Sequence, residues 1–146
     1  MKIFTYITHS HNVILGLAFT ALVLLPGCVS KSQFLTSEII PADRGDVQVK
    51  LDDNKNDNIQ VSIEYLAEAS RLNPPKQTYV IWMESEHNST RNLGQINTTS
   101  SSNKLKADFE TSSSYPPTRI FITAEEDATV AYPGSMIVLT TGRLKG

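Results

Sequence analysis

The stretch IQVSIEY, residues 59–65, alternates apolar and polar side chains at every step. Its apolar positions fall on one face, namely Ile59, Val61, Ile63 and Tyr65. A period of two residues is typical of a β-strand with one buried and one solvated face. The stretch VQVKL, residues 47–51, repeats this pattern with Val47, Val49 and Leu51 on the apolar face. The sequence therefore predicts two neighbouring strands, separated by the turn-forming segment DDNKNDN.

Further strands follow along the chain. The stretches KLKADFE (104–110) and RIFITA (119–124) alternate in the same way, and NLGQI (92–96) does so more weakly. YVIWM (79–83) and MIVL (136–139) are continuously apolar, which predicts central strands covered on both faces. About seven short strands in roughly 100 residues favour an all-β fold, an immunoglobulin-like β-sandwich.

The predicted sandwich covers residues 46–146, and Trp82 is expected in its core. One segment within it, Ser62–Leu72, is rich in helix formers and ends at Asn73-Pro74, a helix stop. We expect a strand to about Ala67, followed by irregular chain or one helical turn. A longer helix over this segment is the alternative.

An apolar segment precedes the only cysteine of the chain. Residues 13–25 are 13 uncharged residues, fewer than the 20 or so that span a bilayer, and they follow a polar start with Lys2. This pattern predicts a secretory signal peptide over residues 1–27. The alternatives are an uncleaved anchor helix and an ordinary signal peptide that happens to contain a cysteine. Turn-rich residues 28–45 are expected to form a tether.

The end of this segment, Leu25-Pro26-Gly27-Cys28, resembles the bacterial lipobox, with Pro26 as a departure from it. The resemblance implies cleavage before Cys28, a diacylglyceryl group on its thiol and an acyl chain on its amine. Two or more acyl chains anchor a protein stably to a bilayer. The expected partner is thus the lipid bilayer and the expected location the bacterial cell envelope. Cys28 is followed by Val29 and Ser30, so the aspartate that favours retention at the inner membrane is missing, which favours the outer membrane. The side of that membrane, periplasmic or surface, stays open.

A second resemblance concerns the pattern YVIWMES…NLGQI…RIFITAEEDAT. It is similar to the extracytoplasmic domain of anti-sigma-K-factor-like proteins, with matches at Tyr79, Trp82, Leu93, Gly94, Phe121 and Glu125. The resemblance implies the fold of this domain. We expect no room in this chain for the cytoplasmic sigma-binding part of those regulators, so their activity is not implied.

Charge and composition argue against several functions. Without Lys2 the mature chain would hold 12 basic and 15 acidic residues, a net charge of −3, which disfavours nucleic acid as a partner. After removal of the leader His87 is the one remaining histidine, which leaves few zinc ligands or nucleophile–base pairs. We therefore expect no enzyme activity, no catalytic residue, no metal and no cofactor.

Five segments are candidate sites. The acidic residues Asp52, Asp53 and Asp57 lie in an Asp/Asn-rich loop that offers calcium ligands, but the loop lacks the glycine and glutamate of a calcium-binding loop, which favours a plain turn. The turns at Tyr115 and Tyr132 offer aromatic rings to sugars or proteins, although we expect each ring to pack beneath its own turn. The remaining candidates are residues for acid–base chemistry. We expect Glu125, Glu126 and Asp127 to form a solvated corner, and His87 to lie in an exposed loop.

Three functions follow from these features. The first is a non-catalytic interaction or structural module of the envelope that contacts another envelope protein. The second is a binding module for calcium, a glycan or another small ligand, through the Asp/Asn loop or the tyrosine turns. The third, a hydrolase built from Glu125, Glu126 and His87, ranks last.

Overall fold

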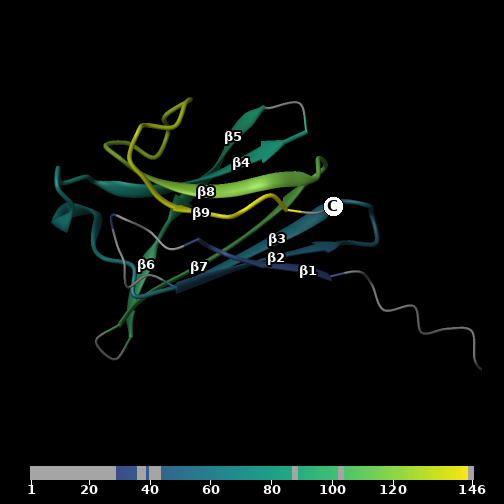
Figure 1. Cartoon of the computed structure of the whole chain (residues 1–146), viewed down its shortest axis with the longest axis horizontal. Coiled ribbons are helices and arrows are strands. Elements are labelled where there is room, and N and C mark those ends of the chain that lie inside the picture. Colours follow the sequence, from purple (N-terminus) through teal and green to yellow (C-terminus); the bar gives the residue numbers. More distant parts are fainter. Residues whose placement is uncertain (1–28, 36–38, 40–43, 87–88, 102–103, 145–146) are drawn as a thin grey trace, which may run out of the picture.

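The computed structural model describes residues 29–35, 39, 44–86, 89–101 and 104–144. In this part of the chain nine strands form two antiparallel sheets (Figure 1), so the predicted all-β sandwich is confirmed. One sheet has the order β1-β2-β3-β7-β6 and the other β5-β4-β8-β9. The strands are β1 (Val29–Gln33), β2 (Arg44–Leu51), β3 (Asp57–Glu64), β4 (Thr78–Ser85), β5 (Thr90–Ile96), β6 (Thr98–Ser101), β7 (Lys104–Ser113), β8 (Pro117–Glu125) and β9 (Ile137–Thr140). The immunoglobulin-like topology stays a prediction.

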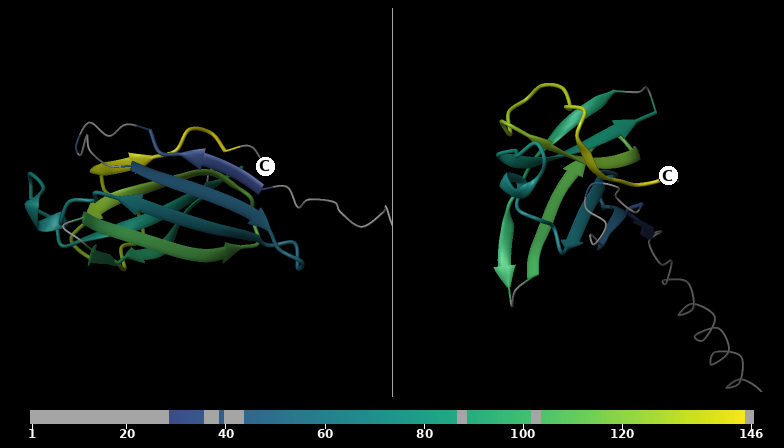
Figure 2. Two further views of the ribbon diagram at one scale, coloured as in Figure 1. Left: turned by 90° about the horizontal axis from the view of Figure 1, so that it is seen from below. Right: turned by 60° about the vertical axis from the view of Figure 1, so that its left-hand side comes forward.

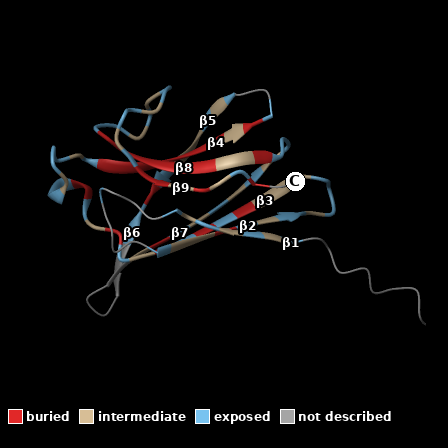
Figure 3. Cartoon of the chain, viewed as in Figure 1, coloured by how far each residue is buried: buried red, intermediate tan, exposed pale blue. Residues whose placement is uncertain are grey.

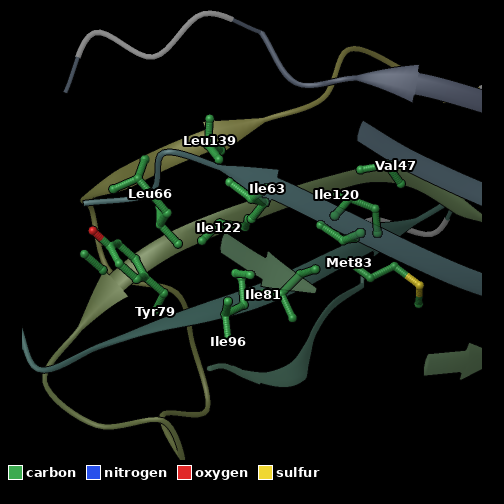
Figure 4. Packing of buried hydrophobic residues seen from close by; sticks show 14 of the residues in the cluster. Val47, Ile63, Leu66, Tyr79, Ile81, Met83, Ile96, Ile120, Ile122 and Leu139 are labelled. Carbon is green, nitrogen blue, oxygen red and sulfur yellow. The ribbon is translucent and has the colours of Figure 1, made fainter. Parts of the chain in front are cut away.

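The main core lies between the two sheets and confirms the alternation of β3. Ile59, Val61 and Ile63 are buried, whereas Gln60 and Ser62 between them are exposed. Their partners from the opposite sheet are seen in Figure 4, and Figure 3 shows the buried residues concentrated between the layers. The apolar period of two residues therefore identifies the face of β3 that packs against the other sheet.

Two residues predicted on buried faces are exposed instead. Tyr65 follows the last residue of β3 and has a φ of 66°, so the chain turns there and Leu66 takes the buried position. Leu51 is the last residue of β2, next to the turn between β2 and β3, and it is more exposed than Val47 deeper in the strand. In both cases the period of two breaks down at a strand end.

The two continuously apolar strands differ in position. The strand at residues 79–83 is confirmed as central: β4 lies between β5 and β8, and Tyr79 to Met83 are all buried. The prediction for residues 136–139 was wrong, because β9 ends the strand order of its sheet and Ile137 is exposed. The N–H of Leu35 donates to the carbonyl of Thr140 (2.8 Å), so the chain after β1 bonds to this edge.

Much of the predicted tether belongs to the sandwich. β1 pairs with β2 from Val29↔Lys50 to Gln33↔Asp46, and β2 begins at Arg44, before the predicted boundary at residue 46. Most of β1 is polar (VSKSQ), and its apolar period is too short to be recognised, because an edge strand is held mainly by backbone pairing. The signal peptide and Cys28 lie outside the described residues.

β6 is the second strand that was not anticipated. β5 ends at Ile96 in one sheet and β6 begins at Thr98 in the other, so the chain changes sheets at Asn97. The Ser/Thr-rich composition of β6 has no apolar period, and backbone pairing with β7, Thr98↔Ala107 to Ser101↔Lys104, places it at the sheet edge.

The segment Ser62–Leu72 follows the predicted order of strand and single helical turn. β3 ends at Glu64, three residues earlier than expected, and a 3₁₀ turn covers Ala69–Arg71. Within the described ranges, the structure contains no helix of the length and apolarity that a bilayer crossing requires.

We predict that the inter-sheet core is the main source of stability. Ile122 is fully buried and lies between Ile81 and Leu139 in the strand register, so Ile122→Ala should lower the free energy of unfolding by about 2–5 kcal/mol. The exposed Ile137 is the matched control, because Ile137→Ala should change the free energy of unfolding by less than about 1 kcal/mol. Urea unfolding measures both values, and equal losses would contradict this core.

Candidate functional site

The four-stranded sheet carries a second, smaller hydrophobic cluster on its outer face. Val80, Trp82 and Phe121 form it, and Ala128 and Val130 from the loop between β8 and β9 pack over it. The rings of Trp82 and Phe121 stack with centroids 6.3 Å apart. Trp82 is fully buried, which confirms its predicted place in the core, but it belongs to this second cluster and not to the one between the sheets. The residues facing the other sheet from β4 are its neighbours in the alternating pattern, Ile81 and Met83.

A chain of hydrogen bonds connects Trp82 to this covering loop, residues 126–136. Nε1 of Trp82 donates to Oγ1 of Thr123 (2.8 Å), and that hydroxyl donates to Oε1 of Glu125 (2.6 Å). The same carboxylate oxygen accepts the backbone N–H of Gly134 (2.7 Å). Glu125 is 7% exposed, and a buried carboxylate needs such donors to be tolerated. It therefore acts as a structural brace for the covering loop.

The other members of the acidic run have separate partners. Glu126 forms an ion pair with Lys76 (2.9 Å). Asp127 accepts hydrogen bonds from the backbone and the hydroxyl of Thr129, which hold the pKa of its carboxyl below the ordinary value. The predicted solvated corner is thus correct for these two residues but wrong for Glu125, which is buried. The geometry joins none of the three to another carboxylate as an acid–base pair.

Asn92 of β5 braces the middle of the covering loop. Its Nδ2 donates to the carbonyls of Ala128 (2.9 Å) and Val130 (3.0 Å). Asn92 lies opposite Trp82 in the register of β4 and β5, so the amide sits beside the cluster that the loop covers. Together with Glu125, it holds the loop backbone at both sides of Tyr132.

The two tyrosine turns flank strand β8 in the chain. Tyr132 is 83% exposed in the covering loop, close to Gly134 at the carboxyl end of β8. Tyr115 precedes the start of β8, and its ring lies 4.6 Å from the guanidinium of Arg91. The nine residues of β8 span about 25 Å; Tyr115 precedes the start of this strand, and Gly134 bonds to Glu125 at its end. The expectation that both rings pack beneath their own turns was wrong for Tyr132.

The Asp/Asn loop is a hairpin turn closed by its own side chain. Oδ1 of Asp52 accepts the N–H groups of Asn54 and Asn56, both at 2.8 Å. Burial and the charge of Asp52 raise the pKa of Asp57, and Asp53 is exposed. No group of three or more His, Cys, Asp or Glu residues among those the structure describes could hold a metal ion, and this includes the three aspartates. The favoured interpretation as a plain turn agrees with this geometry.

The outer face of the five-stranded sheet is hollowed. The hollow has a volume of about 510 Å³, and its polar lining residues are Asp46, Gln48, Gln60, Ser62, Asp108 and Glu110. These side chains bond to one another, for example Ser62 to Asp108 (2.8 Å) and Gln60 to Glu110 (3.2 Å). The alternating pattern identified the polar positions of β3 and β7, but only strand register brings them together.

His87, the remaining candidate for acid–base chemistry, lies outside the described residues.

We predict that Asn92 keeps water away from Trp82. Asn92→Ala removes both bonds to the covering loop and should cost roughly 1–3 kcal/mol of unfolding free energy. Because Trp82 is the only tryptophan, fluorescence reports on it alone, and we expect a red-shifted emission with faster acrylamide quenching. Gln95 of the same strand is the control, since its side chain bonds to Thr78 instead. Unchanged quenching in Asn92→Ala would contradict this role.

The residues that carry the resemblance to anti-sigma-K-factor-like domains all lie in the four-stranded sheet. Tyr79 donates to the carbonyl of Ala67 (2.9 Å), and Gly94 has a φ of 140° with the ring of Phe109 close by. Their roles are structural, so they support no particular activity. Comparison with known proteins finds no matching family model, no matching curated protein and no matching solved structure.

Proposed function

We propose that this chain is a lipid-anchored, non-catalytic module of the bacterial cell envelope that binds another envelope protein through the covering loop. The observation that carries the proposal is Tyr132, which is 83% exposed while the loop backbone on both sides of it is held. Aromatic residues supply large contact areas in protein interfaces, and a loop fixed beforehand loses little entropy on binding. Such a loop is suited to a specific contact.

The structural use of the acidic residues supports a non-catalytic role. Glu125 braces the covering loop, Glu126 pairs with Lys76, and Asp127 binds Thr129. A general acid or base has to reach a substrate in a suitable protonation state, and a pair of carboxylates has to face a common cleft. The three side chains have other partners and face no common site.

A glycan-binding module is the second candidate. The polar hollow on the five-stranded sheet favours it, because carboxylates and amides such as Glu110 and Gln60 can bond to sugar hydroxyls. The side chains there already bond to one another, so a sugar would have to replace these bonds. We therefore rank protein binding through Tyr132 first.

The anchor rests on the leader and on Cys28. The short apolar run and the lipobox-like Leu25-Pro26-Gly27-Cys28 support export followed by acylation, with the outer membrane as the favoured location.

We predict that Cys28→Ala abolishes acylation. Cells grown with labelled palmitate should incorporate it into the wild-type chain and leave the variant unlabelled, because the thiol that carries the diacylglyceryl group is missing. Mass spectrometry should show a wild-type chain that begins at an acylated Cys28. A wild-type chain that keeps Met1 and a free thiol would contradict the anchor.

We predict that a photoreactive amino acid at position 132 crosslinks to a protein in living cells. The same amino acid in place of Gln48, in the polar hollow, is the matched control, since Gln48 is also exposed but lies on the other sheet. One reproducible crosslinked band from position 132, absent from position 48, is the expected result. Bands from position 48 alone would move the binding surface to the hollow and contradict the role of Tyr132.

A further inference from the structure

The first strand of the sandwich starts directly after the cysteine. Val29, the residue that follows Cys28, is already paired with Lys50 of β2. Consecutive Cα atoms lie about 3.8 Å apart, so a lipid on Cys28 is attached almost at the sheet itself. An acylated chain would therefore hold this end of the sandwich against the membrane surface, without a spacer.

The same end contains two further turns. Leu51 pairs with Asp57, and Asp57 pairs with Ser113, so the β2–β3 turn and the end of β7 lie in one row next to the start of β1. The hydroxyl of Ser114 donates to Oδ1 of Asn56 (3.2 Å) and joins these two turns. Figure 2 shows the start of β1 and the β2–β3 turn at one end of the molecule, away from the 3₁₀ turn.

Three large apolar side chains are exposed at this end. Val29 is 51% exposed, Leu51 is 55% exposed and Tyr115 is 52% exposed. They lie at the start of β1, the end of β2 and in the β7–β8 turn; β1 pairs with β2, and the bond between Ser114 and Asn56 joins the β7–β8 turn to the turn after β2. Tyrosine is enriched at membrane–water interfaces, where its ring is buried and its hydroxyl stays hydrated.

The β2–β3 turn and its flanking residues have no excess of positive charge. Lys50 and Lys55 are opposed by Asp52, Asp53 and Asp57, and the guanidinium of Arg91 lies against the ring of Tyr115. A contact driven by anionic headgroups would need an excess of basic residues. The chemistry of this end therefore fits apolar insertion into the interfacial region of a bilayer better than electrostatic attraction.

We infer that Val29, Leu51 and Tyr115 form a membrane-contact surface that seats the sandwich upright on the lipid bilayer. The inference rests on the acylation of Cys28 in the proposed function. The Tyr115 turn precedes β8, whereas Gly134, two residues after Tyr132, bonds to Glu125 at the end of β8, so this orientation places the Gly134 side of the covering loop away from the membrane. The occupant of this surface is the bilayer that holds the anchor, and the covering loop is presented to a partner beyond it.

Site-specific fluorescence quenching tests this orientation. Acylation blocks the thiol of Cys28, so the variants Leu51→Cys, Tyr115→Cys and Tyr132→Cys each offer one thiol for an environment-sensitive dye. The full chain is produced in acylated form and placed in zwitterionic vesicles that contain brominated lipids. All three positions are exposed, so the replacements should leave folding intact, which thermal unfolding checks.

Dyes at positions 51 and 115 should be quenched at least twofold by the brominated lipids, and the dye at position 132 should be unaffected. The quenching should be the same when salt is raised or anionic lipid is added. Vesicle-bound protein with equal quenching at all three positions, or none, would overturn the inference and leave the anchor intact. Protein that does not float with the vesicles would contradict the anchor itself, and with it both proposals.

Discussion

The structure depends on the burial of β4 from both sides. Five consecutive residues of β4, Tyr79 to Met83, are apolar, so neither face of the strand can remain in water without losing the free energy of burial, about 25 cal/mol per Å². The five-stranded sheet covers the face of β4 that carries Ile81 and Met83. The covering loop has to cover the opposite face, which carries Val80 and Trp82. The long connection between β8 and β9 is thus a required part of the core.

The burial of Trp82 brings a polar requirement with it. An indole N–H without a partner in an apolar environment is costly, and Thr123 supplies that partner. The hydroxyl of Thr123 in turn donates to Glu125, and the carboxylate of Glu125 accepts the N–H of Gly134. A requirement of the core therefore determines the position of a surface loop. This is the physical link between the hydrophobic packing and the exposed Tyr132.

The two proposals place different tasks at the two ends of the sandwich. Strand β1 begins one residue after Cys28, and the covering loop follows the end of β8 and packs over the outer face of its sheet. A rigid sandwich between them would hold a binding loop at a constant height above a bilayer. The folded sandwich would set this height, because Val29, the residue after Cys28, is already paired in β1.

The alternation of apolar and polar residues was enough to predict the all-β fold and the buried face of β3, because side chains alternate between sheet faces whatever surrounds them. The central place of β4 was predicted from its continuously apolar run, Tyr79 to Met83. Backbone pairing holds β1 and β6, which have too few apolar residues for a pattern. A fully apolar strand also has no period to show which face meets the other sheet, so the environment of Trp82 depended on the covering loop. The roles of Glu125, Asn92 and the exposed end near Val29 were likewise decided in three dimensions, because each arises from contact between residues far apart in the chain.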